Sequence, residues 1–421
     1  MKLLNIFLIL FLTFVPFHDV NAEVTLQSLI DQTPSDHVLH LKNGIYNEPI
    51  QINKPIILQG NNRTVISSCG KDSTIKINTS KVVLKNITIK YCGKDPKKAA
   101  ISINNGNEQN FKNLKIDTSG MGIQINKVRN SSFNSVMIKG NKLGNGIDVR
   151  DSNSNTFQQI EIQNVMDGIY FETSNQNTVS NSSIKYARYG LHLMYSNDTK
   201  LFQNNSHQNF TGIMIMATKN TLVKQNVFSQ NNQNVNAQGI LLFDAYNTQI
   251  IDNQVNQNRV GIYIEKSQQN KITNNKIDMN FIGIVFKNSE KNHIINNSFI
   301  GNVNGLQTLY KEVNDIRNNQ WDTIQKVDLN HDGINDLPYL ADPYFINLTN
   351  DVPAYQLFFQ SPGMKFIEKL YKNDSNNILM DQQPLFIKSE DHKHLKNNYL
   401  LVGLSVVMIL TSGLTILWGR K

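Results

Sequence analysis

The sequence predicts an all-β fold, a right-handed parallel β-helix, and three observations support that prediction. A Gly-aliphatic-x-aliphatic motif recurs through the 421-residue chain, beginning at Gly122, Gly146, Gly168, Gly190, Gly212, Gly239, Gly261, Gly283 and Gly305. Successive motifs lie 24, 22, 22, 22, 27, 22, 22 and 22 residues apart. Asn-rich turns such as "NKITNNKI" and "NHIINNSF" keep the same spacing. A repeat this short and this rich in Gly and Asn fits a few short strands joined by turns, which is one coil of a β-helix.

The repeat also predicts where the solenoid begins and ends. We expect the β-helix domain to cover residues 23–321, with coils from about Val38 to Trp321 and a short capping helix from Leu26 to Asp31. The spacing of 27 residues between Gly212 and Gly239 predicts a loop at residues 231–236. Residues 322–372 are expected to form a C-terminal cap, and residues 373–398 a polar spacer.

Both ends of the chain predict a membrane-anchored, extracytoplasmic protein. In residues 1–22, Lys2 precedes an apolar run that ends in small residues, which is typical of a secretory signal peptide. Residues 399–418 carry no charge and match the thickness of a bilayer, so they predict a transmembrane helix. The basic tail at residues 419–421 then lies in the cytoplasm by the positive-inside rule. We therefore expect a single-pass protein of the cell membrane whose bulk lies outside the cytoplasm.

Charge and cysteine content narrow the possible partners. The formal net charge of +8 is spread over the chain without basic clusters, so nucleic acid is not the expected partner. The two cysteines, Cys69 and Cys92, each begin the string Cys-Gly-Lys-Asp and lie about one repeat apart. Outside the cytoplasm we expect a disulfide between them on neighbouring coils. A pair of thiolates that binds a soft metal is the alternative.

Side-chain alternation assigns two faces to each repeated strand. The residues one and three positions after each Gly are apolar, with Thr308 as the exception, so we expect them to point into the core. The residues two and four positions after each Gly then point outward. On two adjacent coils these are His192 with Met194, and Met214 with Met216. Because neighbouring strands lie roughly 4.8 Å apart, His192 should lie beside Met214 and Met194 beside Met216.

This outward patch predicts a site for copper. Thioethers are poor ligands for hard cations but suit Cu(I), and imidazole also binds copper. A neutral set of flexible ligands on an open face would bind Cu(I) transiently and hand it on. A Met-rich contact surface for another protein is the alternative. We expect a docking face for a partner beside the patch, formed by Tyr195, Leu241, Phe243 and Tyr263.

A second polar cluster follows the predicted solenoid. Asp328, Asn330, Asp332 and Asp336 have the spacing of oxygen ligands in the first half of a calcium loop, with a Gly at position 333. The twelfth position is Tyr339, where a calcium loop would place a bidentate Glu. The segment indicates either a structural Ca²⁺ site or an Asx-rich turn.

The stretch "RYGLHLMYSND", residues Arg188 to Asp198, resembles the Arg-Tyr-x-x-His-x-Met-Tyr-Ser/Thr pattern of the NosD family. The resemblance extends from about Thr25 to Tyr371. It implies an extracytoplasmic β-helix protein without catalytic activity that assists assembly of the copper centres of nitrous oxide reductase. It also implies partners: the permease and ATPase of an ABC transporter, a copper chaperone and the reductase itself.

Two other classes of protein share the predicted fold. A β-helix polysaccharide lyase or epimerase needs clustered carboxylates, or a base with a charged partner, on one outward face. On the aligned face carboxylates occur singly, as Asp148, Glu172 and Glu265. A non-catalytic surface adhesin would explain the Asn-rich turns but gives no role to the His and Met residues. The sequence therefore favours a copper-binding accessory protein that is not an enzyme.

Overall fold

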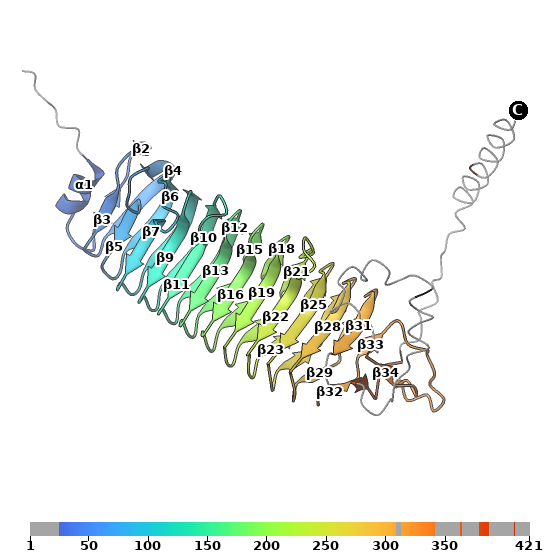
Figure 1. The fold of residues 1–421 in the computed structure, drawn as a ribbon. Helices are drawn as coiled ribbons and strands as arrows, with labels where there is room; N and C mark the ends of the chain where they lie inside the picture. Colours follow the sequence, from blue (N-terminus) through green and yellow to red (C-terminus); the bar gives the residue numbers. More distant parts are fainter. Residues whose placement is uncertain (1–24, 309–312, 342–362, 364–378, 387–407, 409–421) are drawn as a thin grey trace, which may run out of the picture.

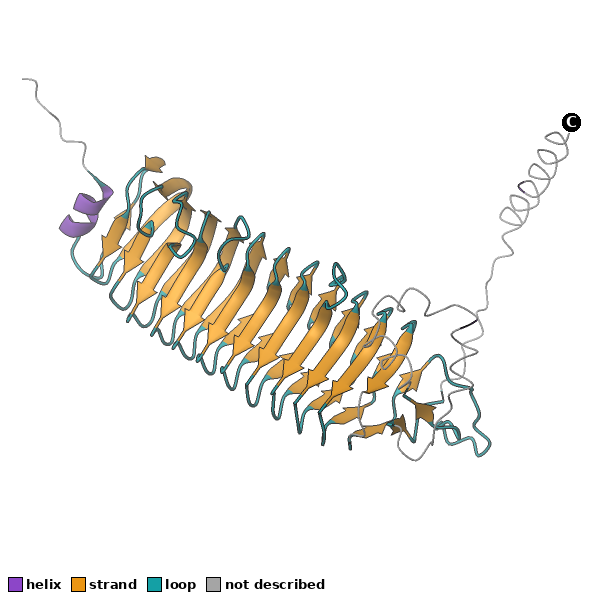
Figure 2. Ribbon diagram, viewed as in Figure 1, coloured by secondary structure: helices purple, strands orange, loops and turns teal. Residues whose placement is uncertain are grey.

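The computed structural model describes residues 25–308, 313–341, 363, 379–386 and 408. These residues form an elongated parallel β-solenoid (Figure 1), which confirms the predicted all-β coil architecture. A sheet of 12 strands runs along one face, and a sheet of 21 strands bends around the rest of each coil. Nearly all regular structure is strand, apart from one short helix at the N-terminal end (Figure 2).

The 12-stranded sheet, called sheet B below, contains one strand from each successive coil, all parallel. Its strands are β3 (Ile50–Ile52), β5 (Ile75–Ile77), β7 (Ala99–Asn104), β9 (Met121–Asn126), β11 (Ile147–Arg150), β13 (Asp167–Glu172), β16 (Tyr189–Met194), β19 (Thr211–Met216), β22 (Gln238–Phe243), β25 (Val260–Glu265), β28 (Ile282–Lys287) and β31 (Asn304–Thr308).

The 21-stranded sheet, called sheet A, covers the other two sides of each coil. It starts with β1 (Val38–His40) and β2 (Gly44–Tyr46), followed by the long bent strands β4 (Ile57–Ser68), β6 (Val83–Tyr91), β8 (Asn110–Thr118), β10 (Ser132–Lys139) and β12 (Thr156–Gln163). Later coils have two short strands each: β14 (Thr178–Ser180), β15 (Ser183–Lys185), β17 (Lys200–Phe202), β18 (Asn205–His207), β20 (Leu222–Lys224), β21 (Val227–Ser229), β23 (Gln249–Ile251), β24 (Gln254–Asn256), β26 (Lys271–Thr273), β27 (Lys276–Asp278), β29 (His293–Ile295), β30 (Ser298–Phe299), β32 (Asp315–Arg317) and β33 (Gln320–Trp321).

Asn and Gln residues occupy many corners of the coils. At the bend between paired sheet A strands, Asn181, Gln203 and Gln225 have φ values of 50°, 53° and 57°. This left-handed conformation disfavours most L-residues but is several-fold enriched in Asn. Inside the coils, a single cluster of apolar side chains runs along the solenoid from Leu26 to Leu379.

A ladder of buried asparagines stacks at one inner corner. The side-chain amide of each residue donates to the side-chain oxygen of the next at 2.9–3.0 Å. The ladder comprises Asn204, Asn226, Asn253, Asn275, Asn297 and Asn319. Because every buried amide finds a partner one coil away, the Asn-rich turns stabilise the stacking of the coils rather than only their bends.

The C-terminal end of the solenoid is capped by chain segments that the repeat does not include. Strand β34 (Tyr339–Leu340) pairs antiparallel with β35 (Met380–Asp381). The Tyr339 ring stacks on Trp321 of the last coil, with centroids 3.9 Å apart. Residues 379–386 thus pack against the solenoid, whereas the sequence predicted them as part of a polar spacer. That prediction was wrong for this stretch because its contacts with the last coil are long-range and non-periodic.

At the N-terminal end, α1 (Leu26–Gln32) buries Leu26 and Ile30 in the core, as the predicted capping helix requires. The expected loop is also present, because no strand occupies the residues between β21 and β22. Within the described residues, no helix is long and apolar enough to cross a membrane. The predicted signal peptide (1–22) and tail (419–421) lie outside the described residues, as does the predicted transmembrane segment (399–418) apart from Met408.

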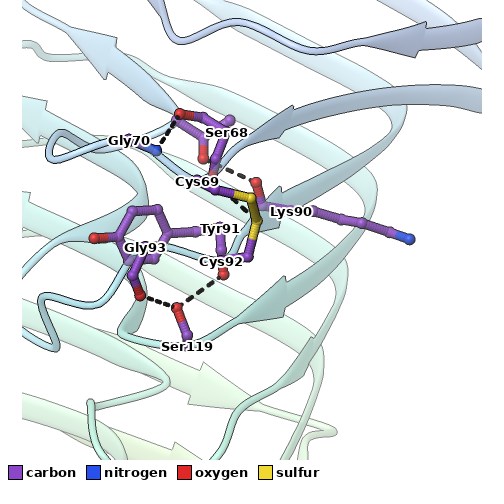
Figure 3. The surroundings of a disulfide bond; sticks show 9 residues. Ser68, Cys69, Gly70, Lys90, Tyr91, Cys92, Gly93 and Ser119 are labelled. Carbon is purple, nitrogen blue, oxygen red and sulfur yellow. Dashed lines mark hydrogen bonds between the residues drawn. A yellow bond between two sulfur atoms is a disulfide. The ribbon is translucent and has the colours of Figure 1, made fainter.

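The predicted disulfide is present near the N-terminal end. Cys69 and Cys92 are bonded, and their Cα atoms lie 4.4 Å apart. They follow β4 and β6 on adjacent coils, and the backbone N–H of Cys92 donates to the Ser68 carbonyl at 3.0 Å (Figure 3). Ser119 of the next coil donates to the Gly93 carbonyl at 2.6 Å, which holds the same loop from the other side. The alternative of two free thiolates is therefore not what the structure shows.

Candidate metal centre

The four predicted ligands come together on the outward face of sheet B. Strand β16 pairs in register with β19, which places His192 beside Met214 and Met194 beside Met216. This is the adjacency expected from the repeat. Met194, Met214 and Met216 are half-buried, so their side chains are partly accessible to solvent.

His192 differs from the expectation of an open site. Only 7% of the residue is exposed. The rings of Tyr170 and Tyr189 lie against its imidazole, with centroids 4.9 and 4.8 Å away. The patch is therefore a half-open arrangement, in which a covered imidazole lies beside thioethers that reach the surface.

The two nitrogens of the His192 ring have different surroundings. Nδ1 lies 2.9 Å from Oδ2 of Asp167, which is itself buried. The guanidinium group of Arg188 donates two hydrogen bonds of 2.8 Å each to the same carboxylate. Nε2 is buried and has no hydrogen-bond partner. Because a carboxylate at Nδ1 favours the tautomer with its proton on that nitrogen, the lone pair of the imidazole is then on Nε2.

Asp167 and Tyr189 belong to this site but were not among the predicted residues. Each directly precedes a repeat glycine, and strict alternation would place that position inside the coil. The alternation is broken at the glycine: a Cβ on Gly168 would lie 2.5 Å from the inward Ile184 side chain. The residue before the glycine can therefore point outward. The signal available in the sequence was the polar character of this position in neighbouring coils, namely Asn145, Asp167, Tyr189 and Thr211.

Asp167 is ionised in its buried position because its partners outweigh its desolvation. Burial alone would raise the pKa of this carboxyl, but the hydrogen bonds from His192 and Arg188 hold the pKa below its usual value. A lowered pKa stabilises the fold above the unfolded-state pKa of about 3.9, and that contribution disappears as the pH falls through the folded-state value.

Asp167→Asn is therefore expected to lower the free energy of unfolding by about 2 kcal/mol at neutral pH, the typical worth of hydrogen bonds to a charged group. The difference from the parent should shrink in acid. Urea denaturation of parent and variant at neutral and at acidic pH measures this difference. An equal loss of unfolding free energy at the two pH values would contradict the prediction.

A second polar network borders the site on the N-terminal side. Arg150 bonds the buried carboxylate of Asp148 at 2.7 Å and also contacts the Glu172 carboxylate. Glu172 pairs in register with Met194. The hydroxyl of Tyr170 donates to the Met194 sulfur at 3.5 Å. Burial, with the nearby Glu172 charge, raises the pKa of Tyr170 to about 12, so this hydroxyl keeps its proton at physiological pH.

The predicted docking residues lie on the other side of the patch. Leu241 and Phe243 pair in register with Met214 and Met216, and Tyr263 lies one strand further. These three side chains are half-buried, whereas Tyr195, at the corner after β16, is 51% exposed. The face thus changes from charged to apolar along the solenoid, and the histidine and methionines lie at the transition.

The donor set fits a soft metal ion. No three His, Cys, Asp or Glu side chains within the described residues are grouped so that they could hold a metal. The patch instead offers one orphaned imidazole nitrogen and three thioethers. Such ligands suit Cu(I) and are poor for hard divalent ions.

The second predicted cation site forms a compact turn. Asp328 accepts the backbone N–H groups of Asp332 and Gly333 at 3.2 Å each. Asn330 donates to Asp332 at 2.9 Å, and Asp336 accepts the N–H of Leu329 at 2.7 Å. The carboxylates therefore make the local bonds of the Asx-rich turn that was the alternative to a calcium loop.

Comparisons with known proteins bear on both the fold and the site. A family described as "Periplasmic copper-binding protein (NosD)" matches residues 128–341. No curated protein matches the sequence. Among solved structures, a mutant of the periplasmic alginate epimerase AlgG is similar with a TM-score of 0.54 and 13% identity, covering 69% of this chain and 82% of that one. The pre-mature gene product 12 of bacteriophage phi29 has a TM-score of 0.51 and 13% identity, covering 66% and 50%. At these identities the similarity shows the fold alone.

Proposed function

Because the chain belongs to the NosD family, we propose that it binds one Cu(I) ion at His192, Met194, Met214 and Met216 and hands it on to a partner. The copper is cargo in this proposal, and the chain is an accessory protein rather than an enzyme.

The observation that supports this proposal best is the state of the His192 ring. A buried nitrogen without a partner is costly, and native structures rarely leave one. Nε2 of His192 is such an atom, and its ring is fixed from the other side by Asp167. Histidines that ligate metals characteristically donate their other N–H to a carboxylate.

The methionines supply the chemistry that suits transfer. They are neutral and half-buried, so a partner's ligands can approach the metal from the solvent side. The apolar residues Leu241, Phe243 and Tyr263, with the exposed Tyr195, provide a surface on which that partner can dock.

The partners and the compartment extend the proposal. We infer that the copper is destined for the copper centres of nitrous oxide reductase, and that a copper chaperone and the permease and ATPase of an ABC transporter take part. A site outside the cytoplasm, with residues 399–418 as the anchor in the cell membrane, is consistent with the periplasmic description of the family. The Cys69–Cys92 disulfide supports an oxidising compartment.

Replacing both Met194 and Met216 with leucine tests the site. We expect the affinity of the purified full-length protein for Cu(I) to fall by about 100-fold, since even losing one outer partner of a metal ligand costs roughly 10–100-fold. Titration against a competing Cu(I) chelator measures this. The free energy of unfolding should change by less than about 0.5 kcal/mol, because neither side chain is in the core. A reductase matured in a strain carrying this variant should lack copper.

Met137→Leu is the matched control, because this thioether lies on sheet A and is 42% exposed. It should leave Cu(I) binding unchanged. If the double variant bound Cu(I) as tightly as the control, the methionine patch would be a protein-docking surface and the copper site would lie elsewhere.

One observation favours a second function. A histidine with a carboxylate on Nδ1 and a free Nε2 is also the arrangement of a general base. A polysaccharide lyase or epimerase would use it on an acidic sugar. Incubating the protein with alginate and other acidic polysaccharides, and following unsaturated ends and epimer content by NMR, distinguishes the two, because turnover lost on His192→Gln would favour the enzyme.

A further inference from the structure

The acidic side chains on the outward face of sheet B share one feature. Asp148, Asp167, Glu172 and Glu265 each contact a cationic side chain from the same or an adjacent coil. Arg150 contacts the first and third, Arg188 the second, and Lys287 the fourth. Three cations therefore engage all four of these carboxylates, and Arg150 engages two of them.

Two of these carboxylates lie next to the soft ligands. Asp167 touches the ring of His192 at 2.9 Å. Glu172 is the register partner of Met194 on the adjacent strand. A carboxylate in such a position would normally be available to a hard or borderline cation, for which carboxylate and imidazole together are good ligands.

Arg188 and Arg150 already bind the oxygens of these two carboxylates. Arg188 donates to both oxygens of Asp167 at 2.8 Å, and Arg150 engages Glu172 while its Nε bonds Asp148. Forked guanidinium bonds of this kind match carboxylate geometry and are stronger than bonds between neutral groups.

Resting on the proposed function, we propose that Arg150 and Arg188 determine the metal specificity of the site. By occupying the only two carboxylates adjacent to His192 and Met194 in the described part of sheet B, they leave a neutral, soft ligand set. That set accepts a monovalent soft ion and excludes divalent ions such as Zn²⁺. The arginines are positioning and specificity residues and do not themselves contact the metal.

The test uses Zn²⁺ alone as the probe, on the full-length protein. Arg188→Gln frees Oδ1 of Asp167, whose Oδ2 stays on His192, and Arg150→Gln frees the Glu172 carboxylate. Each variant should bind Zn²⁺ at least about tenfold more tightly than the parent, in line with the roughly 10–100-fold effects of outer partners on metal affinity. Arg→Lys at either position keeps the charge and should retain much of the discrimination.

Lys287→Gln is the matched control. It frees Glu265 on the same face, but Phe243 lies between Glu265 and Met216, so the carboxylate is two strands, or roughly 10 Å, from the ligands. It should gain no Zn²⁺ affinity. Thermal unfolding checks that each variant is folded. Because the side chains of Arg150 and Arg188 are 43% and 50% exposed, we expect at least one of the two arginine variants to fold.

The outcomes separate this inference from the proposed function. If the parent binds Cu(I) through Met194 and Met216 but neither folded arginine variant gains Zn²⁺ affinity, the specificity role is wrong and the copper site stands. The same holds if Lys287→Gln gains as much as the arginine variants. A second readout is the ¹⁵N shift of the His192 ring nitrogens, which should respond to Zn²⁺ in the Arg188→Gln protein and stay unchanged in the parent.

Discussion

Replacing Asp381 with alanine is expected to lower the free energy of unfolding by about 4 kcal/mol. This carboxylate is fully buried at the C-terminal end of the asparagine ladder. Its Oδ2 accepts the backbone and side-chain N–H groups of Asn319 at 3.1 and 3.0 Å, and the indole N–H of Trp321 at 3.0 Å. Alanine would leave three buried donors without a partner, and each such group costs about 1–3 kcal/mol.

The ladder itself makes Asp381 more than a local cap. Every amide from Asn204 to Asn319 donates in the same direction, toward the C-terminal end. The aligned dipoles therefore present their positive end to Asp381, where a carboxylate is favourable. Asp381→Asn should be milder than Asp381→Ala, because an asparagine would extend the ladder by one acceptor.

Urea denaturation of the three proteins measures these differences. Asp117→Ala is the control, since this aspartate is exposed on strand β8 and should change stability by less than about 0.5 kcal/mol. A loss for Asp381→Ala no larger than the control's would show that residues 379–386 do not cap the solenoid in solution.

The sequence predicted the parts of this molecule that repeat. The glycine spacing predicted the length of a coil, and side-chain alternation predicted which aliphatic residues point into the core. Together they placed His192 beside Met214 without any structural information, because in a parallel solenoid residues one repeat apart are neighbours in space.

The parts it missed are those that break the repeat. No face was predicted for the residue before each glycine; strict alternation would put Asp167 inside the coil, yet Asp167 contacts His192. The cap involves Asn319 and Asp381, which are 62 residues apart and share no periodic relation. The cover over His192 depends on two tyrosines whose ring orientation no spacing could give.

The repeat glycines allow neighbouring coils to approach closely. At Gly261 there is no space for a side chain. A Cβ at this position would lie 2.5 Å from the carbonyl oxygen of Gly283 and 2.9 Å from the Ile277 side chain. The obstacle is backbone of the next coil, which is held in its own sheet by hydrogen bonds and cannot turn aside as a side chain would.

Gly261→Ala is therefore expected to destabilise the protein by about 3 kcal/mol, at the upper end of the usual cost of overpacking a well-packed interior. Gly70→Ala is the control, because its Cβ would meet only the Ser68 hydroxyl, at 3.5 Å. Thermal and urea unfolding of both variants measures the difference. Equal stability of the two would mean that the coils can separate locally at little cost. Since the same close approach to a backbone carbonyl recurs at Gly190, between the strands β16 and β19 that carry the methionines, the spacing of the proposed ligands would then be less fixed than the register implies.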